Sequence, residues 1–167
     1  AIDTSKWQYD VDYVTVSNSV ARITASSKEI RSIVNTFGDV EVRAKWRASD
    51  GGRGGLCFRK HYYAGAASRR KDPGYELRMR PPNSDENLRR WDEDGTATTL
   101  DSASYTYEAD TWYIGFIRGY GSSLEAQATE DADLLSVTDS NYASGEIGFG
   151  SYAYVSETDY FELDWIA

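Results

Sequence analysis

The strongest constraint on the fold is a two-residue alternation of apolar and polar side chains that recurs between short turns. The stretch GYELRMRP (residues 74–81) alternates Tyr, Leu and Met with Glu, Arg and Arg. Successive side chains of a strand point to opposite faces, so this pattern predicts a strand with one face in a core and three charged groups on the other. A helix would need apolar residues every three or four positions, and no long window of the chain has that spacing.

Short, regular spacing of Gly, Ser, Asn and Asp divides the chain into many candidate strands. Hairpin turns are expected at DEDGT (residues 92–96) and GYGSS (residues 119–123), because Asp-Gly and Gly-rich pairs favour tight turns. This number of strands in 167 residues predicts one all-β domain, residues 1–167, built as a two-sheet antiparallel β-sandwich. The predicted strands are residues 11–17, 20–24, 29–35, 39–47, 55–60, 75–80, 87–91, 96–100, 112–119, 124–130, 145–150 and 160–167.

The alternation also assigns side chains to the core. WYIGFIRG (residues 112–119) is apolar on both faces over most of its length, which predicts a central strand covered on both sides. The predicted inward residues are Val40, Val42, Trp46, Leu56, Phe58, Leu77, Met79, Leu88, Trp112, Ile114, Phe116, Ile147, Phe149, Phe161, Leu163 and Trp165.

Charge and composition exclude several classes of protein. The net charge of −9 disfavours a nucleic acid partner, because neutralisation of phosphates supplies most of that affinity. No apolar run is long enough to span a bilayer, so membrane insertion is not expected. The single cysteine, Cys57, allows no intrachain disulfide. A start at Ala1 with no apolar leader is typical of a mature secreted protein or of a module from a larger one, which predicts an extracellular or cell-surface location.

Positive charge is concentrated in the middle of this acidic chain. Between Asp39 and Asp92 there are 13 Lys and Arg against 8 Asp and Glu. If the strands of this region are neighbours, their outward side chains form one cationic surface, and Arg binds carboxylates in a bidentate manner. The predicted ligand-binding residues are Arg43, Lys45, Arg59, Glu76, Arg78, Arg80, Arg89 and Trp91. The alternative interpretation is a solvated sheet face held by cross-strand ion pairs.

Several segments, taken in order, resemble the concanavalin A-like lectin/glucanase superfamily, especially its non-catalytic carbohydrate-binding modules. The resemblance covers nearly the whole chain and implies a jelly-roll sandwich. Proteins with this fold include lectins, hydrolases, lyases and adhesion modules. The resemblance is therefore much less specific for a ligand than for the fold. The segments are DTSKW, FGDVEVRAKWRASDGGRGGLCFR, GYELRMR, LRRWDEDGTATTL, DTWYIGFIRGYGSSLEAQA, TDSNYASGEIGFGSY and YFELDWIA.

The same resemblance implies a structural calcium ion between the amino-terminal segment and the last strand. Asp3 stands at one end of the chain and Glu162 and Asp164 at the other, and hard oxygen ligands suit Ca²⁺. The closing FELDW departs from the pair of adjacent acidic residues that many relatives carry there. Asp3, Glu162 and Asp164 are the predicted metal ligands.

The expected function is non-catalytic binding of an extracellular polysaccharide or glycan, with a uronate-containing polymer favoured by the local positive charge. Other domains of a larger secreted protein are further expected partners. One alternative is a jelly-roll polysaccharide lyase, since Arg78 and Arg80 accompany His61, Tyr62 and Tyr63. Another is a structural or adhesion module of a cell-surface or virion protein. A retaining glycosidase is not expected, because ELD in the last strand lacks the second Glu of family-16-type glucanases.

Overall fold

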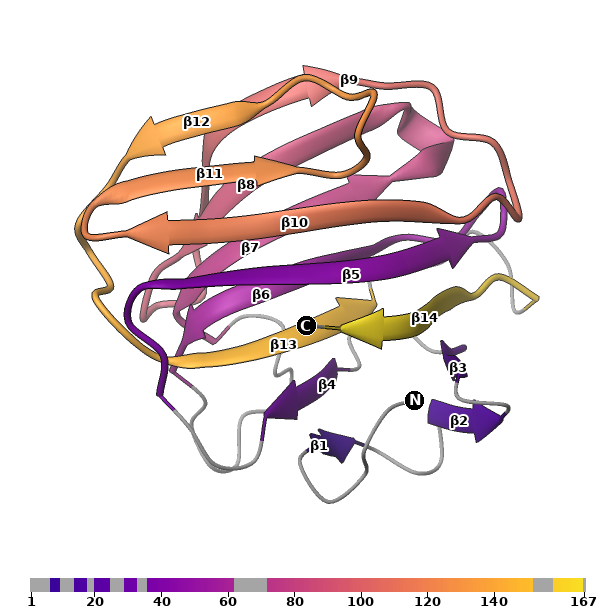
Figure 1. Ribbon diagram of the computed structural model, residues 1–167, viewed down its shortest axis with the longest axis horizontal. Helices are drawn as coiled ribbons and strands as arrows, with labels where there is room; N and C mark the ends of the chain where they lie inside the picture. The colour runs from indigo at the N-terminus through magenta and orange to yellow at the C-terminus, as the bar shows by residue number, and fades with distance from the viewer. Residues whose placement is uncertain are drawn as a thin grey trace.

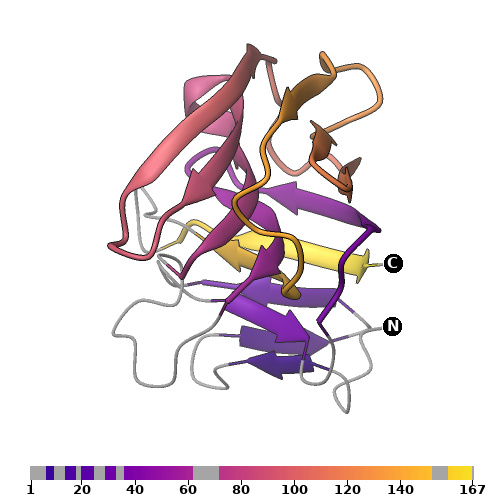
Figure 2. The same cartoon turned by 90° about the vertical axis from the view of Figure 1, so that its left-hand side faces the viewer.

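The chain folds as two antiparallel β-sheets packed face to face, as the sequence predicts (Figures 1 and 2). The structure is a computed structural model that describes residues 7–9, 14–17, 20–24, 29–32, 36–61, 72–151 and 158–166. Over these ranges each sheet has seven strands. No helix among the described residues is long and apolar enough to cross a membrane.

Strands of the two sheets alternate along the chain, so neighbours in one sheet are often distant in sequence. Sheet A has the order β1 (Trp7–Tyr9), β4 (Glu29–Ser32), β13 (Glu146–Ser151), β6 (Gly54–Lys60), β7 (Gly74–Arg80), β8 (Asp85–Trp91), β9 (Ala97–Ser104). Sheet B has the order β12 (Leu135–Thr138), β11 (Ser123–Gln127), β10 (Tyr113–Tyr120), β5 (Val40–Ala48), β14 (Phe161–Ile166), β3 (Val20–Ile23), β2 (Val14–Ser17). A short 3₁₀ turn, η2 (Pro81–Asn83), joins β7 to β8.

Both predicted hairpin turns are present at one end of the sandwich. In the β8–β9 turn, Gly95 has a φ of 77° and its N–H donates to the Asp92 carbonyl at 2.9 Å. In the β10–β11 turn, Gly121 has a φ of 55°. Because L side chains rarely adopt this left-handed region, glycine is the residue that allows the chain to reverse at both places.

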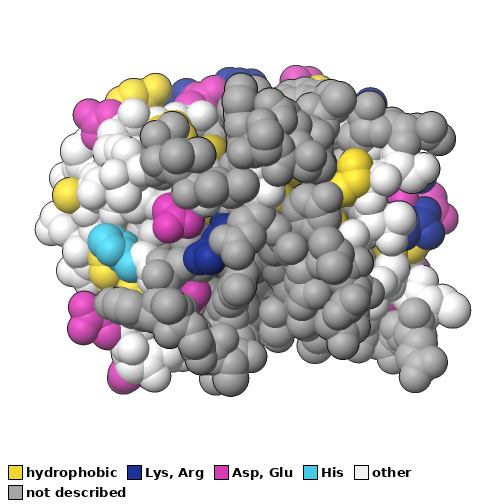
Figure 3. Space-filling view, turned by 90° about the horizontal axis from the view of Figure 1, so that it is seen from below, with side chains coloured by type: hydrophobic (Ala, Val, Ile, Leu, Met, Phe, Trp, Pro, Cys, Tyr) yellow, Lys and Arg dark blue, Asp and Glu magenta, His cyan; other side chains and the backbone are white. Residues whose placement is uncertain are grey.

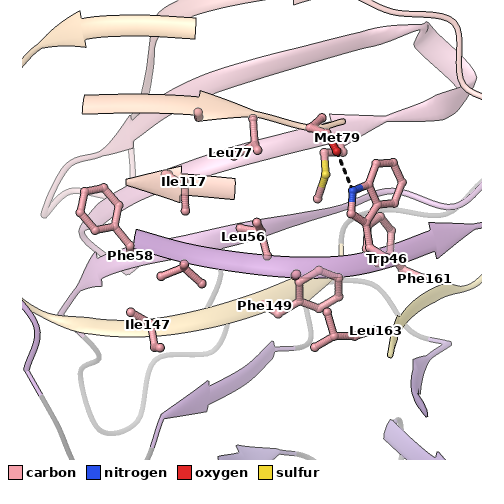
Figure 4. Close-up of a cluster of buried hydrophobic side chains, with 14 of the residues drawn as sticks. Trp46, Leu56, Phe58, Leu77, Met79, Ile117, Ile147, Phe149, Phe161 and Leu163 are labelled. Atoms are coloured by element: carbon pink, nitrogen blue, oxygen red, sulfur yellow. Dashed lines mark hydrogen bonds between the residues drawn. The ribbon is translucent and has the colours of Figure 1, made fainter. Parts of the chain in front are cut away.

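The core lies between the sheets and contains most of the residues that alternation assigned to it (Figure 4). The Trp46 ring stacks on Phe161 at 5.2 Å between centroids, and its indole N–H donates to the Ala128 carbonyl at 2.9 Å. Val40 is half-buried against this core, and the side chain of Trp165 lies outside the described part of the structure. Eleven predicted residues are buried: Val42, Trp46, Leu56, Phe58, Leu77, Met79, Leu88, Ile147, Phe149, Phe161 and Leu163.

The prediction that Trp112, Ile114 and Phe116 point into the core is wrong. β10 is central in sheet B, between β5 and β11, but Ile114 is 37% exposed, and Trp112 and Phe116 are only partly buried. Gly119 faces inward instead, because a Cβ there would stand 2.6 Å from the Phe58 ring. Gly119 leaves room for the Phe58 ring of the opposite sheet, and Ile117 is the residue of β10 that is fully buried in the core, whereas Ile114 and Phe116 lie on the outer face.

The last strands of the two sheets meet at one long side of the sandwich. β9 is the end strand of sheet A and β12 the end strand of sheet B. The Ser136 N–H of β12 donates to the Asp101 carboxylate of β9 at 3.0 Å. This hydrogen bond joins the two sheets directly at their edges.

Candidate functional site

The outward face of β7 and β8 carries a row of charged and polar side chains. Antiparallel pairing sets Glu76 opposite Arg89, Arg78 opposite Asn87, and Arg80 opposite Asp85. The short η2 connection fixes this register, so residues that alternation places outward on each strand become direct cross-strand neighbours.

Four arginines on or beside this face form what we call the arginine cluster: Arg53, Arg78, Arg80 and Arg89. Arg80 donates to the Asp85 carboxylate, with Nε 2.5 Å from Oδ1. Arg78 donates to the neutral side-chain amide of Asn87. The Arg89 guanidinium lies over the Trp91 ring, 4.8 Å from its centroid. Arg78, Arg80 and Arg89 are therefore each held in position by a neighbouring side chain.

Arg53 and Arg89 lie close enough to Arg80 to repel it. The pKa of Arg80 is lowered, first by burial and then by the positive charges of Arg53 and Arg89. The buried Nε of Arg53 has no hydrogen-bond partner among the described residues. An anion bound here would reduce this repulsion.

The other half of the same face is packed and closed. The Trp91 indole N–H donates to Glu76 Oε2 at 2.7 Å, and the Lys60 ammonium donates to the Asp72 carbonyl at 2.8 Å. Trp91 is 5% exposed and Glu76 1% exposed. Trp91 and Glu76 are therefore packed side chains, and the Trp91 ring does not present a free stacking surface.

Two of the predicted binding residues lie on the opposite side of the molecule. Arg43 and Lys45 belong to β5 in sheet B and point away from the core. Arg43 donates to Glu41, and Lys45 Nζ donates to Asp164 at 2.8 Å. The structure does not bring Arg43 and Lys45 to the β7–β8 face, because β5 and β7 belong to different sheets. The outer face of sheet B around Arg43 and Lys45 therefore matches the alternative interpretation, which is a solvated sheet face held by ion pairs.

Arg59 is also absent from the β7–β8 face, because a β-bulge reverses the alternation at the end of β6. The register of β6 against β13 shifts between Glu146 and Gly148, and Arg59 has a φ of 50°. Its side chain is 1% exposed and donates to the carbonyls of Gly38, Gly121 and Tyr142. Arg59 therefore joins three loops instead of facing solvent.

The predicted calcium ligands are only partly described, and the described ones are engaged with cations. Glu162 is 4% exposed, and its two carboxylate oxygens accept hydrogen bonds from Arg22 and Arg47. Asp164 pairs with Lys45, and Asp3 lies outside the described residues. No group of three or more potential metal ligands occurs among the residues that the structure describes. In this arrangement both carboxylate oxygens of Glu162 are engaged with arginines, and calcium binding stays a prediction.

The side chains required for a lyase are separated along sheet A. Arg78 is opposite Gly55, and His61 lies six residues after Gly55, directly after the end of β6. A strand rises about 3.3 Å per residue, which places the His61 and Arg78 backbones roughly 20 Å apart. Tyr62 and Tyr63 lie outside the described residues. The described residues therefore do not bring the predicted base to the arginines.

Sequence reasoning missed Arg53, Asp85 and Asn87. Asp85 and Asn87 carry a usable signal, since a four-residue connection after Arg80 sets the β7–β8 register and hence their cross-strand partners. Arg53 stands in the turn DGGRGG (residues 50–55), and alternation gives no direction to a turn residue. Its place beside Arg80 follows only from the tertiary structure.

Many solved structures have a fold similar to that of this chain. No family model matches the sequence, and no curated protein matches it. A carbohydrate-binding module, CBM66 from Bacillus subtilis, has a similar structure with a TM-score of 0.76, 13% identity, and coverage of 96% of this chain and 93% of that one. The β-glucanase of Bacillus licheniformis has a TM-score of 0.71 at 13% identity, with coverage of 99% and 92%. The alginate lyase AlgAT5 of polysaccharide lyase family 7 has a TM-score of 0.61 at 14% identity, with coverage of 96% and 83%.

These similarities show that the chain has the concanavalin A-like jelly-roll fold, as the sequence resemblance implied. The similar structures include a binding module as well as enzymes, so the fold by itself does not distinguish between binding and catalysis.

Proposed function

We propose that this protein is a non-catalytic carbohydrate-binding module for an anionic extracellular polysaccharide, which it binds through the arginine cluster. The observation that carries the proposal is that Arg53 and Arg89 lie close enough to Arg80 for their positive charges to lower its pKa. The outward side of β7 and β8 holds three arginines beside two carboxylates, Glu76 and Asp85, and Glu76 is buried and hydrogen-bonded to Trp91.

The chemistry of the cluster favours a carboxylate or sulfate group as the element that is recognised. The planar guanidinium presents paired N–H groups that match two oxygens of a carboxylate. Arg78 and Arg80 lie two residues apart on one strand face, about 6.6 Å from each other along the strand. Two anionic groups spaced along a polymer fit such a row better than a single small ion.

Carbohydrate as the ligand class is supported by the similar structures, one of which is a carbohydrate-binding module and two of which are enzymes that act on polysaccharides. Binding without catalysis is supported by the distance between His61 and the arginines, and by the burial of Glu76.

The test is affinity electrophoresis in gels that contain alginate, polygalacturonate or the neutral glucan laminarin, at low and high salt. We expect retardation in the two uronate gels that weakens as salt rises, because salt screens exposed charges. Arg78→Ala and Arg80→Ala should each weaken uronate binding by about 10- to 100-fold, since one charge-assisted hydrogen bond contributes about 1.5–3 kcal/mol.

Arg43→Ala is the matched control, because it removes the same charge from the outer face of sheet B. Its uronate binding should equal that of the wild type. Equal loss in Arg43→Ala and Arg78→Ala would mean that net charge, and not the cluster, drives binding. An absorbance rise from unsaturated uronate product would identify a lyase, and binding to none of the three polymers would favour the adhesion-module alternative.

A further inference from the structure

A hollow of about 380 Å³ lies at the end of the sandwich opposite to the arginine cluster. It is bounded by the end of β6, the β8–β9 turn and the loop between β12 and β13, all at the end that faces the viewer in Figure 2. Its volume is in the range of sites for small ligands. The lining residues are His61, Pro73, Glu93, Asn141, Tyr142, Ala143 and Ser144.

The loop that lines this hollow is held rigidly by buried groups. The Tyr142 N–H donates to the Tyr75 hydroxyl at 3.2 Å, and the Tyr142 carbonyl accepts from Arg59 Nη1 at 3.0 Å. Tyr75 and Arg59 are almost completely buried. The Asn141 N–H donates to Asp139 Oδ1 at 2.9 Å, and that carboxylate also pairs with Arg90 at 2.6 Å. The backbone beneath the hollow therefore has little freedom to move.

Backbone strain is located at the residue that fixes this loop. Arg59 adopts a φ of 50°, a region that non-glycine residues rarely occupy and that costs on the order of 1–3 kcal/mol. The conformation turns its guanidinium inward, where it binds the carbonyls of Gly38 and Gly121 as well as that of Tyr142. Strain of this kind is characteristic of positions where geometry serves a function. Here it holds the lining loop in place.

The side chains around the hollow combine rings with polar groups. The His61 and Tyr142 rings lie 5.5 Å apart at 45°, and His61 is exposed at the surface, where Figure 3 shows the single histidine of the chain in cyan. Glu93, Asn141 and Ser144 are exposed polar residues. A binding site for a pyranose needs rings that pack against the C–H face of the sugar. It also needs hydrogen-bond donors and acceptors for the hydroxyl groups.

We propose that this hollow is a second glycan-binding site, which takes a neutral pyranose against the paired His61 and Tyr142 rings and binds its hydroxyl groups through Glu93, Asn141 and Ser144. A neutral sugar is favoured over an acidic one because Glu93 lines the hollow and Glu146 lies within electrostatic reach of His61. The proposal does not depend on anion binding by the arginine cluster.

If both sites bind, they lie roughly 20 Å apart along sheet A, by the strand rise between Gly55 and His61. One polymer with acidic units and neutral units, or a neutral end, would then contact both sites. Linking two weak sites on one ligand raises the overall affinity well above that of either site alone.

The experiment is saturation-transfer NMR at high salt with neutral trisaccharides of glucose, mannose, galactose and xylose as probes. We expect at least one of them to bind the wild type. Tyr142→Ala should weaken that binding by about tenfold or more, equivalent to about 1.4 kcal/mol, whereas Tyr142→Phe keeps the ring and should bind like the wild type. Glu93→Gln and Asn141→Ala should each weaken it by about 2- to 10-fold, as loss of one hydrogen bond predicts.

Arg78→Ala separates this proposal from the previous one, because it should lose uronate binding and keep neutral-sugar binding. Absence of binding by all four trisaccharides to the wild type would overturn the proposal, as would equal binding by Tyr142→Ala and Tyr142→Phe. Should Tyr142→Ala fail to fold, as judged by circular dichroism, Glu93→Gln and Asn141→Ala decide, and unchanged binding in both would refute it.

Discussion

A carboxylic acid inside the sandwich makes the stability of this protein depend on pH. Glu86 on β8 points inward and is 0% exposed. Its Oε2 accepts from the Ala128 N–H at 2.9 Å and from the Tyr107 hydroxyl at 3.4 Å. Oε1 has no hydrogen-bond partner in the described part of the chain. Burial, and more weakly the charge of Asp133, raise the pKa of Glu86 from 4.5 to about 7 against the opposing effect of these two hydrogen bonds.

The sign of the effect follows from which state binds the proton more tightly. Between pH 4.5 and about 7 the folded chain keeps this proton while the unfolded chain loses it, so the free energy of unfolding falls as pH rises through this window. Above pH 7 the loss is complete. The difference between 4.5 and about 7, at about 1.36 kcal/mol per pKa unit, corresponds to at most about 3.4 kcal/mol of unfolding free energy. Solvent relaxation around the carboxylate reduces this free energy to about 2–3 kcal/mol.

Glu86→Gln removes the ionisation and keeps an acceptor for the Ala128 N–H. Thermal unfolding of wild type and variant at pH 5 and pH 8 tests the reasoning. We expect similar melting temperatures at pH 5 and a variant that is more stable by about 2–3 kcal/mol at pH 8, which is about 4–12 °C for a chain of this size. A difference between the two proteins that stays constant with pH would refute this account. Glu93→Gln, at an exposed position, should follow the pH dependence of the wild type.

Three further perturbations have defined outcomes. Trp91→Ala should lower stability by about 3–5 kcal/mol in a denaturation curve, because a buried ring is lost together with its hydrogen bond to Glu76; a loss below about 1 kcal/mol would contradict its burial. Gly119→Ala should cost about 1–3 kcal/mol, because its Cβ would press on Phe58, and an unchanged melting temperature would show that the ring moves aside. Since Glu162 is engaged with Arg22 and Arg47, a chelator should leave the melting temperature unchanged; a rise on addition of calcium would support Asp3, Glu162 and Asp164 as metal ligands.

Alternation predicted the β7 face correctly because every second residue there is clearly apolar or clearly charged. It failed on β10, where both faces carry apolar residues and Gly119 admits the Phe58 ring from the opposite sheet. It failed again at Arg59, where a bulge inserts one residue and reverses the facing. Both failures arise from contacts between strands that are distant in sequence.

The candidate site was predictable to the extent that its residues share a hairpin. Arg78, Arg80 and Arg89 lie on β7 and β8, which are joined by a short turn, so local pairing brings them together. Arg43 and Lys45 were grouped with them through nearness in sequence, but the chain crosses to the other sheet between β5 and β6. Strand order across a sandwich depends on the packing of both sheets, which a two-residue period does not encode.

The hydrogen bond between the Asp101 carboxylate and the Ser136 N–H bears on the tendency of the protein to aggregate. An end strand with unpaired N–H groups is a template on which a strand from another molecule adds, and this is how sheet proteins begin to aggregate. In this sandwich the Asp101 carboxylate of sheet A accepts a hydrogen bond from the Ser136 N–H at the edge of sheet B. Loss of that carboxylate, as in Asp101→Ala, would therefore be detected first by light scattering in concentrated solution, before any change in the melting temperature of the isolated molecule.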